Sequence, residues 1–152
     1  MSVSVSTMRQ ANEIISEFQH CYALLNRENI DSGWLDNIYD PNMVFQDCFH
    51  HIEGLDHFKR YCSGLYASVL HTRFEFHDQW VKEGSAVLTW TLCYAHPQLL
   101  GGQTITVPGS TVIHFHEKIT HHQDYFDGGA MLYEHLPLLG TAVRFFKKRL
   151  DS

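Results

Sequence analysis

The sequence places a histidine and an aspartate two residues apart in a segment with strand character. His122 and Asp124 lie within Ile119–Asp127, where β-branched and aromatic types precede a pair of glycines. Because successive side chains of a strand point to opposite faces, these two share one face. A histidine beside a carboxylate can relay a proton near neutral pH. The alternative interpretation is that His122 is exposed near a hairpin tip.

Histidines are frequent in this chain, at twelve of 152 residues. Four of them converge on one predicted hairpin: His114, His116, His121 and His122. Two histidines on one strand and a third on its neighbour could supply three imidazoles to zinc. Because this spacing is generic, we predict no bound metal. His50 and His51 precede Gly54 in a predicted loop, which favours a loop mouth or solvent for them over metal binding.

Helical periodicity dominates the first half of the chain. Thr7 and Gln10 have the spacing of a capping box, and apolar residues then recur at steps of three and four up to Leu25. Pro41 disfavours helical geometry in the residue before it and so ends a short second helix. The segments predicted after the first helix are a helix at Asp31–Tyr39, a strand at Met43–Asp47 and a helix from Leu55 to about Ser68.

From Thr72 onward the apolar period changes to two, which predicts strands. The predicted strands run from Thr72 to a turn at Lys82–Ser85, then over Ala86–Ala95, Thr104–His116 and Ile119–Asp127. The Pro108 and Gly109 pair predicts a bulge or sharp bend. Residues 130–150 are predicted to be partly helical, with a break at Pro137. Helices followed by a strand meander predict one α+β domain over residues 1–152, with a strongly curved antiparallel sheet packed on helices.

Composition and charge narrow the classes of function. The chain is 44% hydrophobic and 18% charged, so it has ample apolar surface to bury. Its net charge of −6 opposes binding to nucleic acid or anionic lipid. The basic run Arg144–Arg149 is interpreted as a solvated helix end, and the aromatic residues Phe74, Phe76, Trp80 and Trp90 as core or interface. Apolar residues on both sheet faces predict a homodimer through the outer face.

The cysteine pattern and the start of the chain bear on location. Cys21, Cys48, Cys62 and Cys93 occur singly, which is typical of reduced and mostly buried thiols. Residues 1–10 lack the apolar core of a signal peptide, and no later stretch is long and apolar enough to span a bilayer. We therefore expect a cytoplasmic protein.

The order of the predicted elements resembles the nuclear-transport-factor-2-like superfamily, whose cone-shaped fold is shared by ketosteroid isomerase, scytalone dehydratase, limonene epoxide hydrolase and the SnoaL-type polyketide cyclases. The stretch from Lys118 through Asp124, Tyr125, Phe126 and Asp127 is similar to the terminal strand of limonene epoxide hydrolase and of many SnoaL-like proteins. In those proteins a glycine precedes the lysine, and here Glu117 replaces it. The resemblance implies the cystatin-like α+β roll of this superfamily.

The resemblance also implies roles for two acids. In the epoxide hydrolase the first aspartate of this terminal tetrad helps to activate the attacking water, which assigns that role to Asp124. The general-base aspartate of ketosteroid isomerase corresponds in position to Asp47. Neither set of catalytic residues is complete in this chain. Residues 90–94 contain no arginine or aspartate, which the epoxide hydrolase has on its middle strand, and residues 112–114 contain no acid, which ketosteroid isomerase has on its penultimate strand.

The candidate site follows from these assignments. A carboxyl desolvated in an apolar cavity acquires the raised pKa that proton transfer near neutral pH requires. Asp47, Asp124 and His122 are therefore the candidate catalytic residues, and the alternative is that each acid caps a turn or makes a structural hydrogen bond. The predicted pocket-lining residues are Tyr22, Phe45, Trp90, His114 and Phe126. Asp127 lies on the other face of its strand and is expected to cap the following turn.

Two functions of different classes remain open at this point. The first is a cofactor-free acid–base enzyme, an isomerase, dehydratase, cyclase or hydrolase, that acts on a small apolar molecule. The second is a non-catalytic module of the same fold that binds a ligand or a protein partner.

Overall fold

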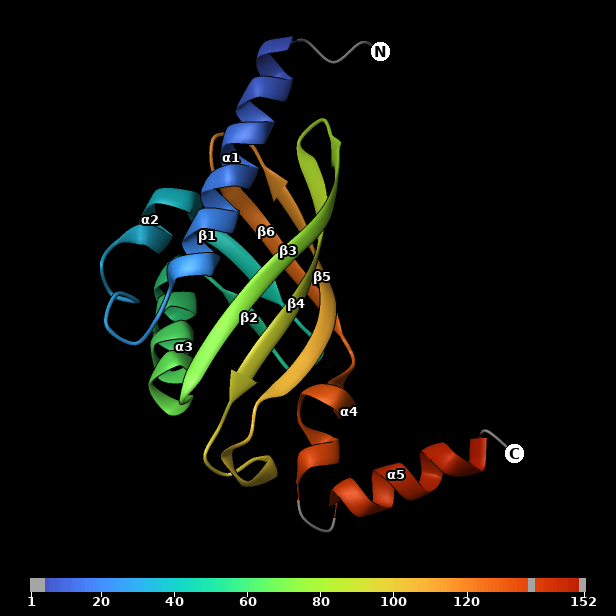
Figure 1. Ribbon diagram of the computed structural model, residues 1–152. Helices are drawn as coiled ribbons and strands as arrows, with labels where there is room; N and C mark the ends of the chain where they lie inside the picture. Colours follow the sequence, from blue (N-terminus) through green and yellow to red (C-terminus); the bar gives the residue numbers. More distant parts are fainter. Residues whose placement is uncertain (1–4, 137–138, 151–152) are drawn as a thin grey trace.

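Helices packed on one curved sheet make up the structure, a computed structural model that describes residues 5–136 and 139–150 (Figure 1). The elements are α1 Val5–Leu24, α2 Trp34–Ile38, β1 Tyr39–Gln46, β2 His51–Glu53, α3 Leu55–Ser68, β3 His71–Lys82, β4 Ser85–Ala95, η1 Leu100–Gly102, β5 Ile105–Phe115, β6 Ile119–Phe126, α4 Gly128–Met131, η2 Tyr133–His135 and α5 Leu139–Leu150. Strands β3 to β6 follow the first three helices without a long helix between them, so the predicted α+β class is confirmed.

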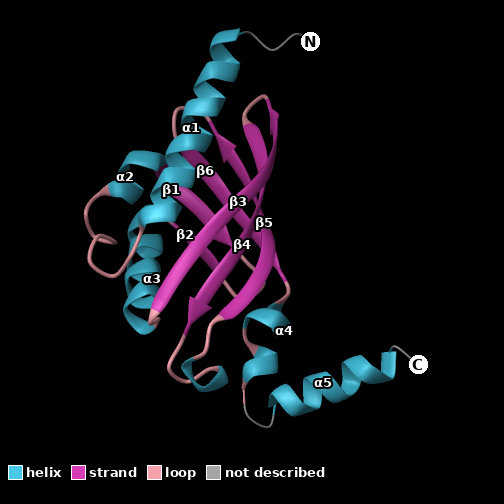
Figure 2. Ribbon diagram, in the orientation of Figure 1, coloured by secondary structure: helices cyan, strands magenta, loops and turns pink. Residues whose placement is uncertain are grey.

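The sheet has six strands in the order β2-β1-β6-β5-β4-β3 (Figure 2). Neighbouring strands are antiparallel except β1 and β6, which run parallel. The sheet is therefore mixed, and the prediction of an antiparallel sheet is wrong at this one pair. The pairing places Phe45 of β1 beside His122 of β6. Segments far apart in the sequence thus meet in the middle of the sheet.

Two amphipathic helices cover one face of the sheet (Figure 1). Ala11, Ile15 and Phe18 of α1 are almost completely buried. The buried stripe of α3 consists of Leu55, Phe58, Cys62 and Tyr66. Full burial of one large apolar side chain contributes about 1.5–3 kcal/mol, so these stripes fix both helices on the sheet. No helix in the described part of the chain is long and apolar enough to cross a bilayer.

The starts and ends of two helices differ from the predictions. α1 is already helical at Val5, so Thr7 lies inside the helix and the predicted capping-box start is wrong. α2 begins only at Trp34 and ends at Ile38. Tyr39 has extended backbone geometry and opens β1, although the sequence predicted it as the end of the helix. This change carries the Tyr39 side chain into the core.

A bulge in β3 changes which side chains face the core. His77 and Asp78 together oppose the single residue Thr89 on β4. The Asp78 N–H donates to Thr89 Oγ1 at 3.0 Å, which satisfies a backbone donor that the bulge leaves unpaired. Beyond the bulge the alternation is shifted by one residue, so Trp80 lies on the surface rather than in the core.

The segment after β6 is fastened by Asp127. Its carboxylate accepts hydrogen bonds from the first amides of α4, which confirms the predicted cap, and the Ala130 amide is the main group that lowers its pKa. Lys147 of α5 lies 3.4 Å from the same carboxylate. The basic run Arg144–Arg149 ends this helix, as predicted. The predicted break at Pro137 lies outside the described residues.

Gly109 gives the indole of Trp90 its place in the core. The two residues are cross-strand partners, and the pairing of β4 with β5 continues in register through Pro108 and Gly109. The predicted bulge at this step is therefore wrong. A Cβ at Gly109 would lie 2.6 Å from two carbons of the Trp90 ring, well inside contact distance. Glycine is needed here because the indole packs directly against the backbone.

We expect Gly109→Ala to lower the free energy of unfolding by about 1–3 kcal/mol, because the methyl group must displace the buried indole. Gly64→Ala is the matched control. Gly64 lies exposed in α3 with nothing within 4 Å of an added Cβ, so alanine should raise stability by up to about 1 kcal/mol. Urea unfolding followed by tryptophan fluorescence measures both. Equal stability of Gly109→Ala and the unchanged protein would contradict this packing.

Candidate active site

A cavity of about 420 Å³ lies between α3, the inner face of the sheet and the segment after β6. Its wall is mostly aromatic and aliphatic, and two carboxylates, Asp47 and Asp124, interrupt it. His50, Leu65 and Gln98 line the cavity and are also exposed, so they form its rim. The volume is in the range of pockets that hold small organic molecules.

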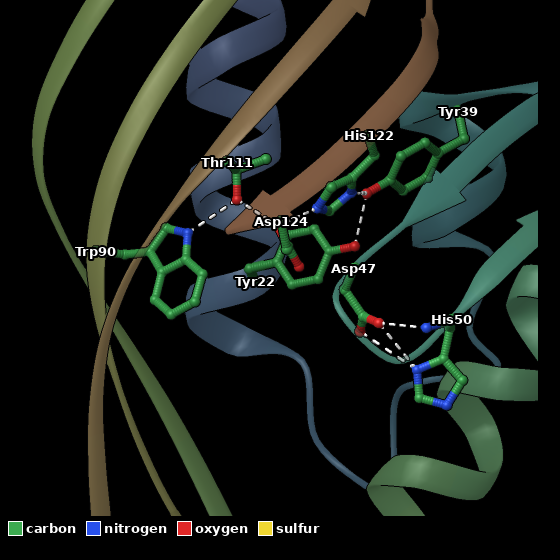
Figure 3. Close-up of polar contacts among 8 residues, drawn as sticks. All are labelled: Tyr22, Tyr39, Asp47, His50, Trp90, Thr111, His122 and Asp124. Atoms are coloured by element: carbon green, nitrogen blue, oxygen red, sulfur yellow. Dashed lines mark hydrogen bonds and ion pairs between the residues drawn. The ribbon is translucent and has the colours of Figure 1, made fainter. Parts of the chain in front are cut away.

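Four side chains form a hydrogen-bonded chain through the core beside this cavity (Figure 3). The Tyr22 and Tyr39 hydroxyl oxygens are 2.6 Å apart, and the Tyr39 hydroxyl lies 2.7 Å from His122 Nδ1. His122 Nε2 lies 2.7 Å from Asp124 Oδ1. Tyr39 and His122 are buried, and of the four side chains only Tyr39 is not part of the cavity lining, while Tyr22 and Asp124 at the two ends both line it. The chain therefore begins and ends at the cavity wall.

The chemistry of the groups fixes the direction of this chain. An ionised carboxylate only accepts hydrogen bonds, so His122 Nε2 carries the hydrogen that Asp124 Oδ1 receives. In a neutral ring Nδ1 then accepts from the Tyr39 hydroxyl, which in turn accepts from Tyr22. Burial raises the pKa of both tyrosines well above the ordinary value, so both hydroxyls keep their hydrogens.

A second branch reaches Asp124 from the opposite side. Trp90 Nε1 donates to Thr111 Oγ1 at 2.8 Å, and Thr111 Oγ1 donates to Asp124 Oδ1 at 2.6 Å. Oδ1 thus accepts two hydrogen bonds. Asp124 Oδ2 has no hydrogen-bond partner within the described residues, and the side chain is 19% exposed. One oxygen fixes the carboxylate, and the other is free to meet a ligand in the cavity.

Asp47 lines the cavity but is engaged in a turn. Its Oδ1 accepts the backbone N–H groups of Phe49 at 2.8 Å and His50 at 2.7 Å, and it lies 3.1 Å from His50 Nδ1. The side chain is only 6% exposed. Asp47 and Asp124 each lie two residues beyond the paired residues Phe45 and His122, so both carboxylates face the same side of the sheet.

The structure brings together most of the residues singled out from the sequence. Tyr22, Phe45, Trp90 and Phe126 line the cavity. His114 does not, and its predicted pocket position is wrong. Thr111, Ile113 and Phe115 of β5 are buried, so His114 between them points outward and its ring lies 5.9 Å from that of His121. His122 is in the core rather than at a hairpin tip.

Three residues of the site were missed by the sequence analysis. Tyr39 was assigned to a helix end, and the local pattern carried no signal for its place in β1. Thr111 alternates with Ile113 along β5 and could have been found by strand period alone. Tyr61 projects from α3 into the cavity wall. Its hydroxyl makes no hydrogen bond within the described residues, and burial is the main cause that raises its pKa.

The cysteines and histidines form no metal cluster in residues 5–136 and 139–150. No group of three or more histidine, cysteine, aspartate or glutamate side chains there is arranged to hold an ion. Cys21 and Cys62 are buried, and burial raises the pKa of the Cys21 thiol to about 12. Cys48 is exposed and Cys93 is half-buried.

Comparison with known proteins gives a consistent result for the fold. Residues 18–122 match the SnoaL-like domain family. A hypothetical protein from Catenulispora acidiphila, described as having a ketosteroid isomerase-like fold and solved in complex with trimethylamine, has a TM-score of 0.69 at 15% identity, covering 82% of this chain and 94% of that one. A proposed SnoaL-like polyketide cyclase from Jannaschia has a TM-score of 0.68 at 16% identity, covering 87% and 94%.

An epoxide hydrolase of M. tuberculosis, described as similar to limonene epoxide hydrolase, has a TM-score of 0.63 at 16% identity, covering 78% of this chain and 84% of that one. No protein with a curated description is detectably similar in sequence. At these identities the solved structures establish the fold and not the reaction.

The direction of the hydrogen-bonded chain leads to a stability prediction. Tyr39→Phe should lower the free energy of unfolding by about 1–3 kcal/mol, because it leaves His122 Nδ1 and the Tyr22 hydroxyl without their partner. Tyr22→Phe removes only the terminal donor, and Tyr39 can still donate to His122. Its cost should be less than about 1 kcal/mol. Urea unfolding of the two variants measures the difference, and equal losses would contradict the proposed direction.

Proposed function

Because this chain belongs to the SnoaL-like domain family, we propose that it binds a small apolar molecule and acts on it as a cofactor-free acid–base enzyme. One observation carries the proposal. Asp124 Oδ1 is held by His122 and Thr111, while Oδ2 is left open on the wall of an apolar cavity. A fixed carboxylate with one unoccupied oxygen is the arrangement that a general base requires.

In the proposed reaction Asp124 Oδ2 accepts a proton from a carbon next to a carbonyl group of the ligand. The electron pair of the broken C–H bond moves toward the carbonyl oxygen, where a hydrogen-bond donor stabilises it. Asp124 then returns the proton to a second carbon of the same molecule, which completes an isomerisation. The step needs no other reactant, and all atoms remain in the ligand.

Tyr61 is suited to be the donor to that oxygen. Its hydroxyl is free of protein partners within the described residues, and its raised pKa keeps the hydrogen in place. After burial, the charges of Asp47 and Asp124 are further causes of this raised pKa. Phe58 stacks against its ring, Phe45 packs against it at a tilt, and together they hold it at the wall.

A non-catalytic ligand-binding or association module is the competing proposal. The same cavity could hold an apolar ligand without any proton transfer, since apolar burial alone provides affinity. The two proposals differ in what they require of Asp124. The enzyme requires the charged carboxylate of Asp124 as a base, whereas the binding module requires only a side chain of the same shape.

The test uses 5-nitrobenzisoxazole, a small apolar carbon acid that loses a proton to a base, breaks its own N–O bond and yields a coloured nitrophenolate. We expect the unchanged protein to accelerate this reaction and Asp124→Asn to lower the rate by about 100-fold or more. The amide oxygen of asparagine can still accept from His122 and Thr111, so the melting temperature should change little.

Asp56→Asn is the control for this test, because Asp56 is exposed in the first turn of α3 and outside the cavity. Its rate should match that of the unchanged protein. Binding of the probe without acceleration, or equal rates for Asp124→Asn and Asp56→Asn, would favour the non-catalytic module.

We also propose a homodimer formed through the outer face of the sheet. Val87 and Val112 are cross-strand partners there, and Tyr125 is 57% exposed. The remaining outer positions are largely threonine, serine and histidine, so the face is less apolar than the sequence suggested. Light scattering should give the mass of two chains at micromolar concentration, and Val112→Glu should give one. A single-chain mass for the unchanged protein would refute the dimer.

A further inference from the structure

We propose that His50 is a second proton-transfer residue of this cavity, held in position by Asp47. The inference rests on the proposed acid–base function and extends it to the rim. It changes the role expected of Asp47, which becomes a positioning residue rather than the base itself. The two residues lie together in Figure 3, where the Asp47 carboxylate faces both the backbone N–H and the ring of His50.

The hydrogen bonds of Asp47 leave little freedom for it to act as a base. Oδ1 accepts two backbone amides and lies within reach of His50 Nδ1, and Oδ2 lies 3.3 Å from the same ring nitrogen. The Asp47 N–H also donates to the His50 carbonyl oxygen at 3.0 Å, which closes the turn. A carboxylate so occupied orients its neighbours, in contrast to Asp124 with its open Oδ2.

The position of Asp47 determines which nitrogen of His50 is basic. A carboxylate accepts only, so Nδ1 facing it carries the hydrogen. In the neutral ring the lone pair is then on Nε2, which has no partner within the described residues. An imidazole oriented by a carboxylate with a free second nitrogen is a general-base arrangement.

The ring is placed where a ligand in the cavity would meet solvent. His50 lines the cavity, its side chain is 42% exposed, and its ring centroid lies 4.7 Å from that of Tyr61. The titratable groups that face it are Asp47 from its own turn and Tyr61 from α3. His122 differs because both of its ring nitrogens are occupied, which suits a positioning role.

This arrangement indicates a class of ligand. Its apolar body would occupy the aromatic interior, with its acidic carbon near Asp124. A hydroxyl or carbonyl group would lie at the rim, where His50 Nε2 can take a proton from the hydroxyl or from a water that attacks the carbonyl carbon. Two proton-transfer groups at different depths allow one proton to be removed inside the cavity while another moves at its mouth.

The test uses 4-nitrophenyl acetate at about pH 8, above the ordinary histidine pKa of about 6.5. The Nε2 lone pair attacks the ester carbonyl, 4-nitrophenolate leaves, and water hydrolyses the acyl-imidazole. We expect His50→Gln to lower nitrophenolate release by about tenfold or more. His51→Gln is the matched control, because His51 is exposed in the same segment but its Nε2 lies 3.3 Å from Glu53 and it is outside the cavity lining. Its rate should be unchanged.

A second measurement tests the positioning role of Asp47. Nitrogen NMR of the imidazole rings should place the hydrogen of neutral His50 on Nδ1 in the unchanged protein, and Asp47→Asn should shift it toward Nε2, because the amide group can donate to Nδ1. Equal nitrophenolate release by His50→Gln and His51→Gln, or a hydrogen on Nε2 in the unchanged protein, would overturn the inference. The benzisoxazole reports on Asp124 and the ester on His50, so failure of one proposal is distinguishable from failure of the other.

Discussion

A buried histidine with a partner on each ring nitrogen is the constraint on which this site depends. His122 is 4% exposed, and burying its polar nitrogens without hydrogen bonds would cost several kcal/mol. Its partners come from different strands, Tyr39 at the start of β1 and Asp124 on β6 itself. The first and last strands must therefore lie side by side, and the parallel pairing of β1 with β6 meets this requirement. The topology of the sheet thus determines the geometry of the site, because the pairing of β1 with β6 brings both partners of His122 together.

The opposite side of Asp124 is fixed by shape as much as by hydrogen bonding. The Trp90 indole reaches Thr111 only because Gly109 lets the ring lie against the backbone. Thr111 then donates to the same carboxylate oxygen that His122 approaches. Converging donors stabilise one ionised oxygen and orient the other, which is how a protein presents a carboxylate in an apolar cavity without leaving the charge unpaired.

Local patterns in the sequence predict local features well and long-range pairing poorly. The period of two correctly places His122 and Asp124 on one face, and the spacing after β6 correctly gives Asp127 as a cap. The parallel pairing of β1 with β6 could not be predicted, because no local pattern specifies which distant strand pairs with β1. The bulge that turns Trp80 outward depends on a hydrogen bond from a neighbouring strand, so alternation alone could not reveal it.

The two histidine–carboxylate pairs of the cavity present opposite ring nitrogens to their carboxylates, and this difference separates their chemistry. Asp124 faces Nε2 of His122, whereas Asp47 faces Nδ1 of His50. In the buried pair the free acceptor is a carboxylate oxygen, and in the rim pair it is a ring nitrogen. A carboxylate deep in an apolar wall suits abstraction of a proton from carbon, while an imidazole near solvent suits exchange of a proton with a hydroxyl or with water. Between the two pairs the cavity wall is mostly aromatic and aliphatic, and Tyr61 supplies a hydroxyl there, so the shape of the cavity together with this one donor selects the ligand that spans both.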